Sequence, residues 1–423
     1  TAAGTVKIVS APTASERFTV TDNGFVYYAA YNSLNYTYDL YRSDGAEAGT
    51  ILLLPGLYYD AFPVAVGNTV FFANSDNSNG TELWKTDGTV AGTTIVKDIY
   101  PGANSSAPYS LTVFNGNIYF GAYDGTNSAY SFWRSNGTEA GTIKLSTVTP
   151  YTQNVFDNNK HFCVSNNTLY FTASDIVNGN GYELWKTTGT ANSTKMVKDI
   201  YPGSFGSNPG YLTDVNGTLF FMANDPLYGQ ELWGSNGTAS GTKLIKDVTP
   251  GGSTYLNYPP TVAAGRFYFV VFDSLWVSAG TAASTKQVND AGLSGLQYIQ
   301  NLTGTPTKLF FGAYTYNNGY ELYVGDLTPG AATIASTDDA ITLPAFDAKI
   351  YPNPVKNVAQ VTVSGDAKKL NITVRDINGK VVLQQKFSNT TQLTLQTGKF
   401  AAGVYFVTVH NGRESKVIKL VKD

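Results

Sequence analysis

The sequence predicts an all-β protein with two domains: a seven-bladed β-propeller, closed into a ring by an N-terminal strand, and a small Ig-like antiparallel β-sandwich. Two observations predict the propeller. A block of strand-like sequence recurs along most of the chain, and Asn-Gly or Asp-Gly turns separate its runs of alternating apolar residues. A third observation, a change of pattern near the C-terminus, predicts the sandwich.

Composition agrees with this fold class. The 423 residues are enough for one large and one small domain. Charged residues make up only 14%, and polarity comes instead from Asn, Thr, Ser, Gly and Tyr, as in turn-rich β proteins. The net charge of −3 without a basic stripe argues against a nucleic-acid partner, and no apolar run reaches the roughly 18 residues that a membrane span needs.

The ends of the chain and its cysteine content bear on its location. Cys163 is the single cysteine, so an intrachain disulfide is excluded. The sequence starts at Thr1 without a methionine, and we expect a mature chain from which an N-terminal signal peptide has been removed. Both observations suit a secreted protein that is held together by a large closed fold.

The repeat is clearest in three blocks that begin at Glu82, Glu183 and Glu231. Each block contains Glu-Leu-Trp, then x-Gly-Thr, then Lys-Asp-x-x-Pro-Gly. The aligned aromatic residues are 43 to 52 residues apart, a period that suits propeller blades of four strands. These seven residues are Tyr41, Trp84, Trp133, Trp185, Trp233, Trp276 and Tyr323.

The last repeat is predicted to lack its fourth strand. After Asp326 no Gly-Thr-x-apolar segment follows, whereas residues 4–10 near the N-terminus read like the fourth strand of another blade. We therefore predict that residues 4–10 pair with the last blade and close the ring, which removes the exposed strand edges of an open one.

These blocks resemble the Glu-Leu-Trp-x-x-Asp-Gly-Thr repeats of secreted bacterial propeller-like proteins, over residues 1–326. The resemblance implies an extracellular location and says little about the ligand or the activity. Residues 327–346 are small and polar and are predicted to form a linker, in which proteolytic cleavage would be easiest.

Residues 347–423 follow a different pattern of short alternating strands with Asn-Gly turns. The segments Ile350–Val355, Val374–Val382, Gly403–Val409 and Lys416–Lys422 resemble, in order and spacing, a type A sorting domain of the type 9 secretion system of Bacteroidetes. The residues expected to carry the sorting signal are Pro352, Asn353, Pro354, Asp376, Gly379, Gly403, Tyr405, Lys416, Ile418, Lys419 and Leu420.

This resemblance implies export across the outer membrane and a final location in the medium or on the cell surface. It also implies two partners for the C-terminal domain, an outer-membrane shuttle barrel and the translocon. Independently of the resemblance, a terminal strand such as Lys416–Val421 is suited to strand addition onto a partner.

Several repeated side chains have both a functional and a structural interpretation. The five tryptophans could stack on sugars, but aromatic residues that recur once per repeat more often pack between blades, so Trp84, Trp133, Trp185, Trp233 and Trp276 are predicted to be core residues. A column of aspartates after the second strand of each repeat could bind a cation, but Asx turns are favoured: Asp76, Asp124, Asp175, Asp225 and Asp273.

Two further sets are predicted to be structural. The Lys-Asp pairs that begin at Lys97, Lys198 and Lys246 would reduce aggregation at an edge strand and form weak surface ion pairs. His161 and Cys163 share a strand face but lack the third partner that a nucleophile or a metal site would need.

The sequence therefore predicts a secreted or cell-surface protein that is not an enzyme, without cofactor, metal or catalytic residues. The propeller is predicted to be a binding module for a surface protein or a polysaccharide, linked by the resemblance to adhesion or gliding motility. The alternative is a secreted polysaccharide-active enzyme, a glycosidase or lyase that uses the propeller funnel.

Overall fold

The computed structural model describes residues 14–57, 63–126, 129–152, 160–289, 291–327, 333–336, 347–364, 369–388, 390, 392–411 and 415–423. The chain divides into two compact units, Thr1–Ile334 and Ala335–Asp423. Each unit consists of antiparallel β-sheets, so the predicted all-β class is confirmed.

Seven sheets make up the described part of the first unit, and six of them have four strands in chain order. The fourth sheet has five, because β13 and β14 both pair with β15. The strands of the first three sheets are β1 (Ala14–Val20), β2 (Val26–Asn32), β3 (Thr37–Ser43), β4 (Ile51–Leu57), β5 (Val64–Val66), β6 (Thr69–Asp76), β7 (Gly80–Thr86), β8 (Thr94–Lys97), β9 (Tyr109–Phe114), β10 (Asn117–Ala122), β11 (Ser131–Ser135) and β12 (Ile143–Ser146).

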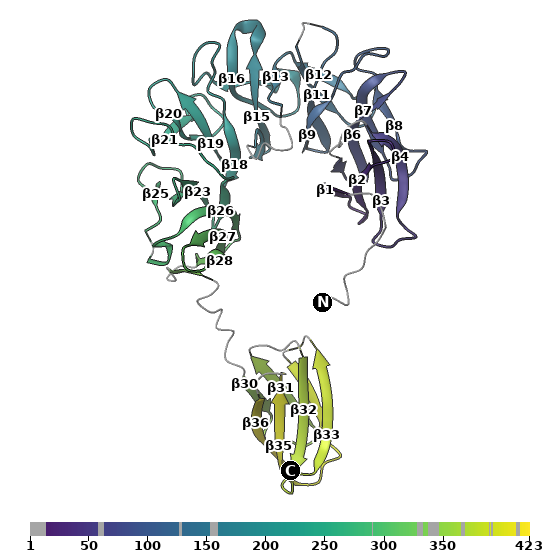
Figure 1. Ribbon diagram of the computed structural model, residues 1–423, viewed down its shortest axis with the longest axis vertical. Helices are drawn as coiled ribbons and strands as arrows, with labels where there is room; N and C mark the ends of the chain where they lie inside the picture. The colour runs from purple at the N-terminus through teal and green to yellow at the C-terminus, as the bar shows by residue number, and fades with distance from the viewer. Residues whose placement is uncertain are drawn as a thin grey trace. The chain divides into compact units, whose positions relative to one another are not determined.

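The next four sheets follow one another in the same way (Figure 1). Their strands are β13 (Thr149–Pro150), β14 (Phe162–Ser165), β15 (Thr168–Asp175), β16 (Asn180–Thr187), β17 (Lys195–Lys198), β18 (Gly210–Val215), β19 (Thr218–Asp225), β20 (Gly229–Ser235), β21 (Lys243–Lys246), β22 (Thr261–Ala263), β23 (Arg266–Val271), β24 (Ser274–Ser278), β25 (Lys286–Gln287), β26 (Gln297–Gly304), β27 (Lys308–Thr315), β28 (Gly319–Asp326) and β29 (Thr333–Ser336). Short 3-10 turns occur at η2 (Ile176–Asn178), η3 (Ala191–Ser193) and η4 (Ala291–Leu293).

The repeated aromatic residue occupies the same register position in every sheet. On the third strand it lies opposite an aromatic residue of the second strand, as in the pairs Trp84 with Phe72 and Trp233 with Phe221. One residue before it, the ladder to the fourth strand is shifted, so that Leu83 pairs with Lys97 while Trp84 pairs with Ile95. The Asn-Gly and x-Gly-Thr turns on either side set this register, because their glycines adopt positive φ angles.

The core of the first unit lies between consecutive sheets. Six clusters of buried side chains each join one sheet to the next, from the first sheet to the seventh. The second and third sheets, for example, share Leu83 and Phe71 on one side and Phe120 and Trp133 on the other. The apolar alternation along each strand therefore faces two neighbouring sheets, as radial packing of propeller blades requires.

The first and last sheets lie at the two ends of an arc that is not closed (Figure 1). The predicted absence of a fourth strand in the last sheet is corrected, because β28 pairs with β29, a segment that was assigned to the linker. Residues 4–10, which were predicted to supply that strand, lie outside the described residues. The Gly-Thr motif was too strict a criterion, since β-strand pairing uses backbone groups that any sequence supplies.

The second unit contains two sheets that enclose one core. The residues at the centre of this core, Val361, Ile372, Val407 and Leu420, are fully buried and come from both sheets. The sheets consist of β30 (Asp347–Tyr351), β31 (Val358–Ser364) and β34 (Gln392–Gln396), and of β33 (Val381–Ser388), β32 (Lys369–Asp376), β35 (Gly403–His410) and β36 (Ser415–Lys422), each in spatial order.

Candidate functional surfaces

The repeat tryptophans lie within the clusters between sheets. Trp133, Trp185 and Trp233 are at most 7% exposed, and Trp84 and Trp276 are half-buried at the margins of their clusters. Lysines of the preceding sheet lie over two of the rings, with the Nζ of Lys198 5.4 Å from the centroid of Trp233. At these positions the rings are covered by protein and do not form an exposed platform for a sugar.

The repeated glutamates anchor the chain between sheets. The carboxylate of Glu82 is fully buried and accepts hydrogen bonds from the backbone N–H groups of Ile99 (3.0 Å) and Tyr100 (3.2 Å). It also accepts bonds from the backbone N–H (3.0 Å) and hydroxyl (2.6 Å) of Ser106. Burial raises the pKa of this carboxyl, and the hydrogen bonds oppose that effect without reversing it.

The same arrangement recurs at Glu183 and Glu231, which are also fully buried and whose pKa values burial raises in the same way. Glu183 accepts bonds from Ile200, Tyr201 and Ser207. The Glu-Leu-Trp motif and the Lys-Asp-x-x-Pro-Gly motif recur together because this carboxylate joins them. We name Glu82, Glu183 and Glu231 the glutamate anchors.

The aspartates after the second strand form Asx turns. Oδ1 of Asp76 accepts from the N–H groups of Ser78 (2.8 Å) and Asn79 (2.6 Å), and Oδ1 of Asp225 accepts from Leu227 (2.8 Å). Hydrogen bonds from Asn79 lower the pKa of Asp76. Asp273 differs, because it accepts from the N–H of Tyr298 in the next sheet (2.9 Å).

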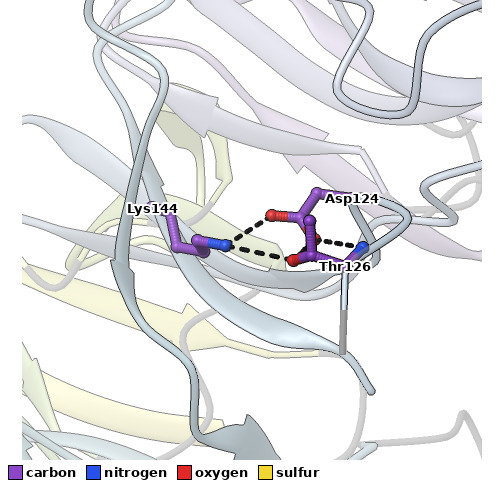
Figure 2. Close-up of polar contacts among 3 residues, drawn as sticks. All are labelled: Asp124, Thr126 and Lys144. Carbon is purple, nitrogen blue, oxygen red and sulfur yellow. Dashed lines mark hydrogen bonds and ion pairs between the residues drawn. The ribbon is translucent and has the colours of Figure 1, made fainter. Parts of the chain in front are cut away.

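At Asp124 a lysine occupies the place that a cation would take. The Nζ of Lys144 lies 2.6 Å from Oδ2, while Thr126 donates to Oδ1 through its N–H (3.0 Å) and its hydroxyl (2.5 Å) (Figure 2). Burial acts to raise the pKa of Asp124, but the hydrogen bonds from Lys144 and Thr126 outweigh it and lower the pKa. Among the described residues, no three His, Cys, Asp or Glu side chains gather in a way that could hold a metal ion.

The fourth-strand lysines hold neighbouring sheets together and are not exposed edge charges, which corrects the prediction for them. Lys97, Lys198 and Lys246 each donate to a backbone carbonyl of the next sheet, at 3.2, 3.0 and 2.7 Å. Third-strand cations do the same to the glycine carbonyl of the next x-Gly-Thr turn, as in Lys85 to Gly137 (2.8 Å). Sequence inspection missed these contacts because the acceptors are backbone atoms about 45 residues away, whereas side-chain patterns report local pairing.

His161 and Cys163 have structural surroundings. His161 is 1% exposed, stacks on Tyr151 with 3.7 Å between ring centroids, and contacts the carbonyl of Pro209 through Nδ1 (3.0 Å). Cys163 lies half-buried in β14, and burial raises the pKa of its thiol to about 11, so the thiolate is scarce at neutral pH.

Exposed aromatic residues gather on one face of the first unit, and sequence inspection did not identify them. This face consists of the turns between second and third strands and the connections between consecutive sheets, which run beside each other: Tyr298 lies against Asp273, and Ser253 accepts from Gln230. We name its exposed aromatic residues the aromatic rim: Tyr36 (80%), Tyr130 (37%), Phe205 (79%), Tyr228 (43%), Tyr255 (63%), Phe272 (72%), Tyr298 (51%), Tyr316 (82%) and Tyr320 (58%).

In the second unit, Asn353 anchors the last strand. Its side-chain amide donates to the carbonyl of Lys419 (2.7 Å) and accepts from the N–H of Val421 (2.8 Å), as a paired strand would. Val355 continues this pairing by donating to the carbonyl of Val421 (2.8 Å) and accepting from Asp423 (3.1 Å). The Pro-Asn-Pro motif thus covers part of the outer edge of β36.

The other predicted sorting residues lie in turns, in the core or on β36. Asp376 accepts from the N–H groups of Asn378 (2.9 Å) and Lys380 (3.0 Å), and Gly379 in the same turn has a φ of +80°. Tyr405 is buried and donates its hydroxyl to the carbonyl of Ala401 (2.9 Å). The remaining positions are Pro352 and Pro354 beside Asn353, Gly403 at the start of β35, Lys416 and Lys419 exposed on β36, Ile418 half-buried and Leu420 fully buried.

Residues 349–423 match the family model described as the secretion system C-terminal sorting domain. The C-terminal unit is therefore a type 9 sorting domain, and its presence makes the chain a cargo that is exported and then secreted or attached to the cell surface. No curated protein matches the sequence. In the part of the chain that the structure describes, no helix has the length and apolar character to span a membrane.

The chain is also similar to several solved structures at low sequence identity. Puromycin hydrolase is 13% identical, with a TM-score of 0.42, and the match covers 84% of this chain and 59% of that one. A prolyl endopeptidase structure is 12% identical at a TM-score of 0.42, covering 95% of this chain and 54% of the other. The β-propeller domain of the Trilobed protease from Pyrococcus furiosus, described as having an open velcro topology, is 10% identical at a TM-score of 0.37, covering 76% and 97%.

These findings correct the prediction that the chain is not an enzyme. The solved structures similar to it include a hydrolase and peptidases, so an absence of activity cannot be assigned from the fold. Their identities and TM-scores are too low to carry an argument for any one activity of this chain.

Proposed function

We propose that the chain is a type 9 cargo in which residues 347–423 act as the export and sorting signal and residues 1–326 act outside the cell as a binding module. One observation carries the export function: residues 349–423 match the family model of the secretion system C-terminal sorting domain. Attachment to surfaces, as in adhesion or gliding, is the role proposed for the binding module.

The proposed partners of the sorting domain are the shuttle barrel and the translocon of the outer membrane. Support comes from β36, which is the last strand of its sheet and exposes Lys416, Val417 and Lys419. Because the Lys419 carbonyl and the Val421 N–H both point away from β35 toward Asn353, the backbone of Val417 points to the same outer edge. This edge can add to a strand of a partner.

The test is a pull-down of the full-length chain from outer membranes of the producing bacterium, followed by mass spectrometry. We expect recovery of the shuttle barrel and the translocon from the wild type and their loss on deletion of residues 347–423. Val417→Pro removes the outward N–H and is expected to weaken recovery, whereas Val417→Thr keeps that N–H and is the control. Unchanged recovery from the deletion variant would contradict the proposal.

We also propose that the seven sheets are the blades of one seven-bladed propeller whose first and last sheets meet. Support comes from the leucine of the repeat, which packs on a neighbouring sheet and is fully buried at Leu83, Leu184 and Leu232. Its equivalent in the last sheet, Leu322, is 51% exposed. Contact between the first and last sheets would remove this apolar surface from water.

A further inference from the structure

The turns on the two faces of the first unit differ in their hydrogen bonding and in their exposed side chains. Turns between first and second strands, and between third and fourth, are bonded from sheet to sheet: Asn166 donates to the carbonyl of Gly217 (2.6 Å) and Asn216 to that of Gly265 (3.0 Å). In the described turns of that face no aromatic side chain is exposed. All members of the aromatic rim lie on the opposite face, and among the described residues of the first unit the remaining exposed aromatic residue is Phe18 on β1.

The fold does not require the rim residues. Asx turns form with the same hydrogen bonds whether their central residues are Asn77 and Ser78 in the second sheet or Pro226 and Leu227 in the fifth. Rim residues such as Tyr316 and Phe272 remain 82% and 72% exposed. Large exposed rings gathered mainly on one face indicate a binding surface more than a requirement of folding.

The rings are most concentrated at the last two sheets. Tyr298, Tyr316 and Tyr320 surround the half-buried Tyr314, with centroids 6.1, 5.9 and 5.3 Å from its ring. Phe272 belongs to the same part of the face, because the Asp273 side chain beside it accepts from the N–H of Tyr298.

The charges on this face disfavour polyanionic ligands. Exposed or half-buried aspartates of these turns and connections are Asp76, Asp124, Asp225 and Asp273, together with Asp98, Asp199 and Asp247 that follow the fourth strands, whereas Asp175 is buried. Lys160 is the single cation in the described residues of these turns and connections. Lys144 of β12 neutralises Asp124, and the remaining carboxylates would repel a polyanion.

Amide side chains lie beside several of the rings, and exposed aliphatic residues such as Leu34 and Leu227 occur in the same turns. Asn317 and Asn318 follow Tyr316, and Asn35 precedes Tyr36. A protein partner is usually met by a contiguous apolar centre, whereas a sugar ring offers an apolar C–H face with hydroxyl groups at its edge. Tyrosine rings flanked by amides match the sugar ligand.

We propose that the aromatic rim binds a neutral polysaccharide, with Phe272, Tyr298 and Tyr316 stacking on successive sugar rings and neighbouring amides bonding to hydroxyl groups. This inference rests on the proposed binding function and names the class of its ligand.

The test is affinity electrophoresis of the full-length chain in native gels that contain hydroxyethylcellulose, glucomannan or, as the polyanion, alginate. We expect retardation by at least one neutral polymer and none by alginate. The variant Phe272→Ala/Tyr298→Ala/Tyr316→Ala is expected to raise the Kd by about tenfold or more. The control variant, Val90→Ala/Val113→Ala/Val164→Ala, alters exposed side chains of the opposite face. Its Kd is expected to equal that of the wild type.

Three outcomes would overturn the inference. They are no retardation by either neutral polymer, retardation by alginate alone, or equal losses of affinity for the neutral polymer in the rim and control variants at unchanged melting temperatures. Capture of a surface protein by the wild type but not by the rim variant, without retardation by glycans, would overturn the polysaccharide while retaining the binding module. If neither glycan retardation nor capture of a surface protein is observed, the proposed binding function is contradicted as well. The proposed export function is tested separately by the pull-down from outer membranes.

Discussion

At the scale of single residues, the glutamate anchors are the side chains on which each repeat depends. Every oxygen of the Glu183 carboxylate receives two donors, from Ile200, Tyr201 and Ser207. An amide at this position could not accept from these four donors, because it has one acceptor oxygen where a carboxylate has two.

Glu183→Gln should therefore destabilise the first unit by about 1–3 kcal/mol, because the amide NH2 would face donors and leave buried N–H or hydroxyl groups unpaired. Chemical denaturation measures the free energy of unfolding. Glu139→Gln, at an exposed position, is the matched control and should change it little. Equal stability of the two variants would contradict the anchoring role.

The same glutamates predict a pH dependence. Their pKa values in the folded protein are raised by burial. Between the ordinary range of a glutamate and the raised value, the folded protein keeps protons that the unfolded chain has released, so the stabilising contribution is full at low pH and is lost as pH rises through the folded pKa. The difference in melting temperature between wild type and Glu183→Gln should thus shrink as pH rises. A difference that grows with pH would show that the pKa is lowered.

Asn353 is the corresponding residue of the sorting domain. Asn353→Ala removes both hydrogen bonds to β36 and should raise the exchange rate of the Val421 amide hydrogen by about thirtyfold, since each lost bond contributes about 1 kcal/mol. Hydrogen-exchange mass spectrometry of the C-terminal peptide measures this rate. Gln384→Ala, exposed on β33, should leave it unchanged.

At the scale of elements, cations link each sheet to the next through backbone carbonyls. Lys198→Met keeps the apolar stem over Trp233 and removes the bond to the Thr242 carbonyl, and should cost about 1 kcal/mol. Lys195→Met, exposed on the same strand, serves as the control for loss of charge. Urea denaturation of both variants separates the two effects, and similar midpoints would argue against the link.

Elements also show which features can be predicted from sequence. The strands around Trp84, Trp185 and Trp233 follow from local alternation and glycine turns, which act over a few residues. The sorting domain was predicted from its motifs, and its family match bears this out. The pairing of β29 with β28 and the contacts of Lys97 could not be predicted, because their backbone partners leave no side-chain signature.

The aromatic rim escaped prediction for a related reason. Tyr316 and Phe272 lie in turns whose sequences differ from repeat to repeat, and a search for recurring residues passes over such positions. Their common face becomes visible only when the sheets are placed side by side.

At the scale of the whole first unit, the proposed ring predicts the behaviour of Leu322. If the first and last sheets meet in solution, Leu322→Ala should cost about 2–4 kcal/mol, as at a buried leucine. If the arc stays open, the loss should be below about 1 kcal/mol. Leu227→Ala, in an exposed turn, is the control. Denaturation of the full chain decides between the two arrangements.

The contact between Asn353 and β36 also makes the outer edge of the sorting domain depend on the completeness of the chain. The strand that the export machinery would grasp is held by a residue that lies 66 to 68 positions earlier in the chain. A chain that ended before Lys419, through premature termination or proteolysis, would leave Asn353 without its strand, and the outer edge of β36 would not form. Under the proposed function, only a chain that is complete and folded through β36 would then present the strand edge that the export machinery binds.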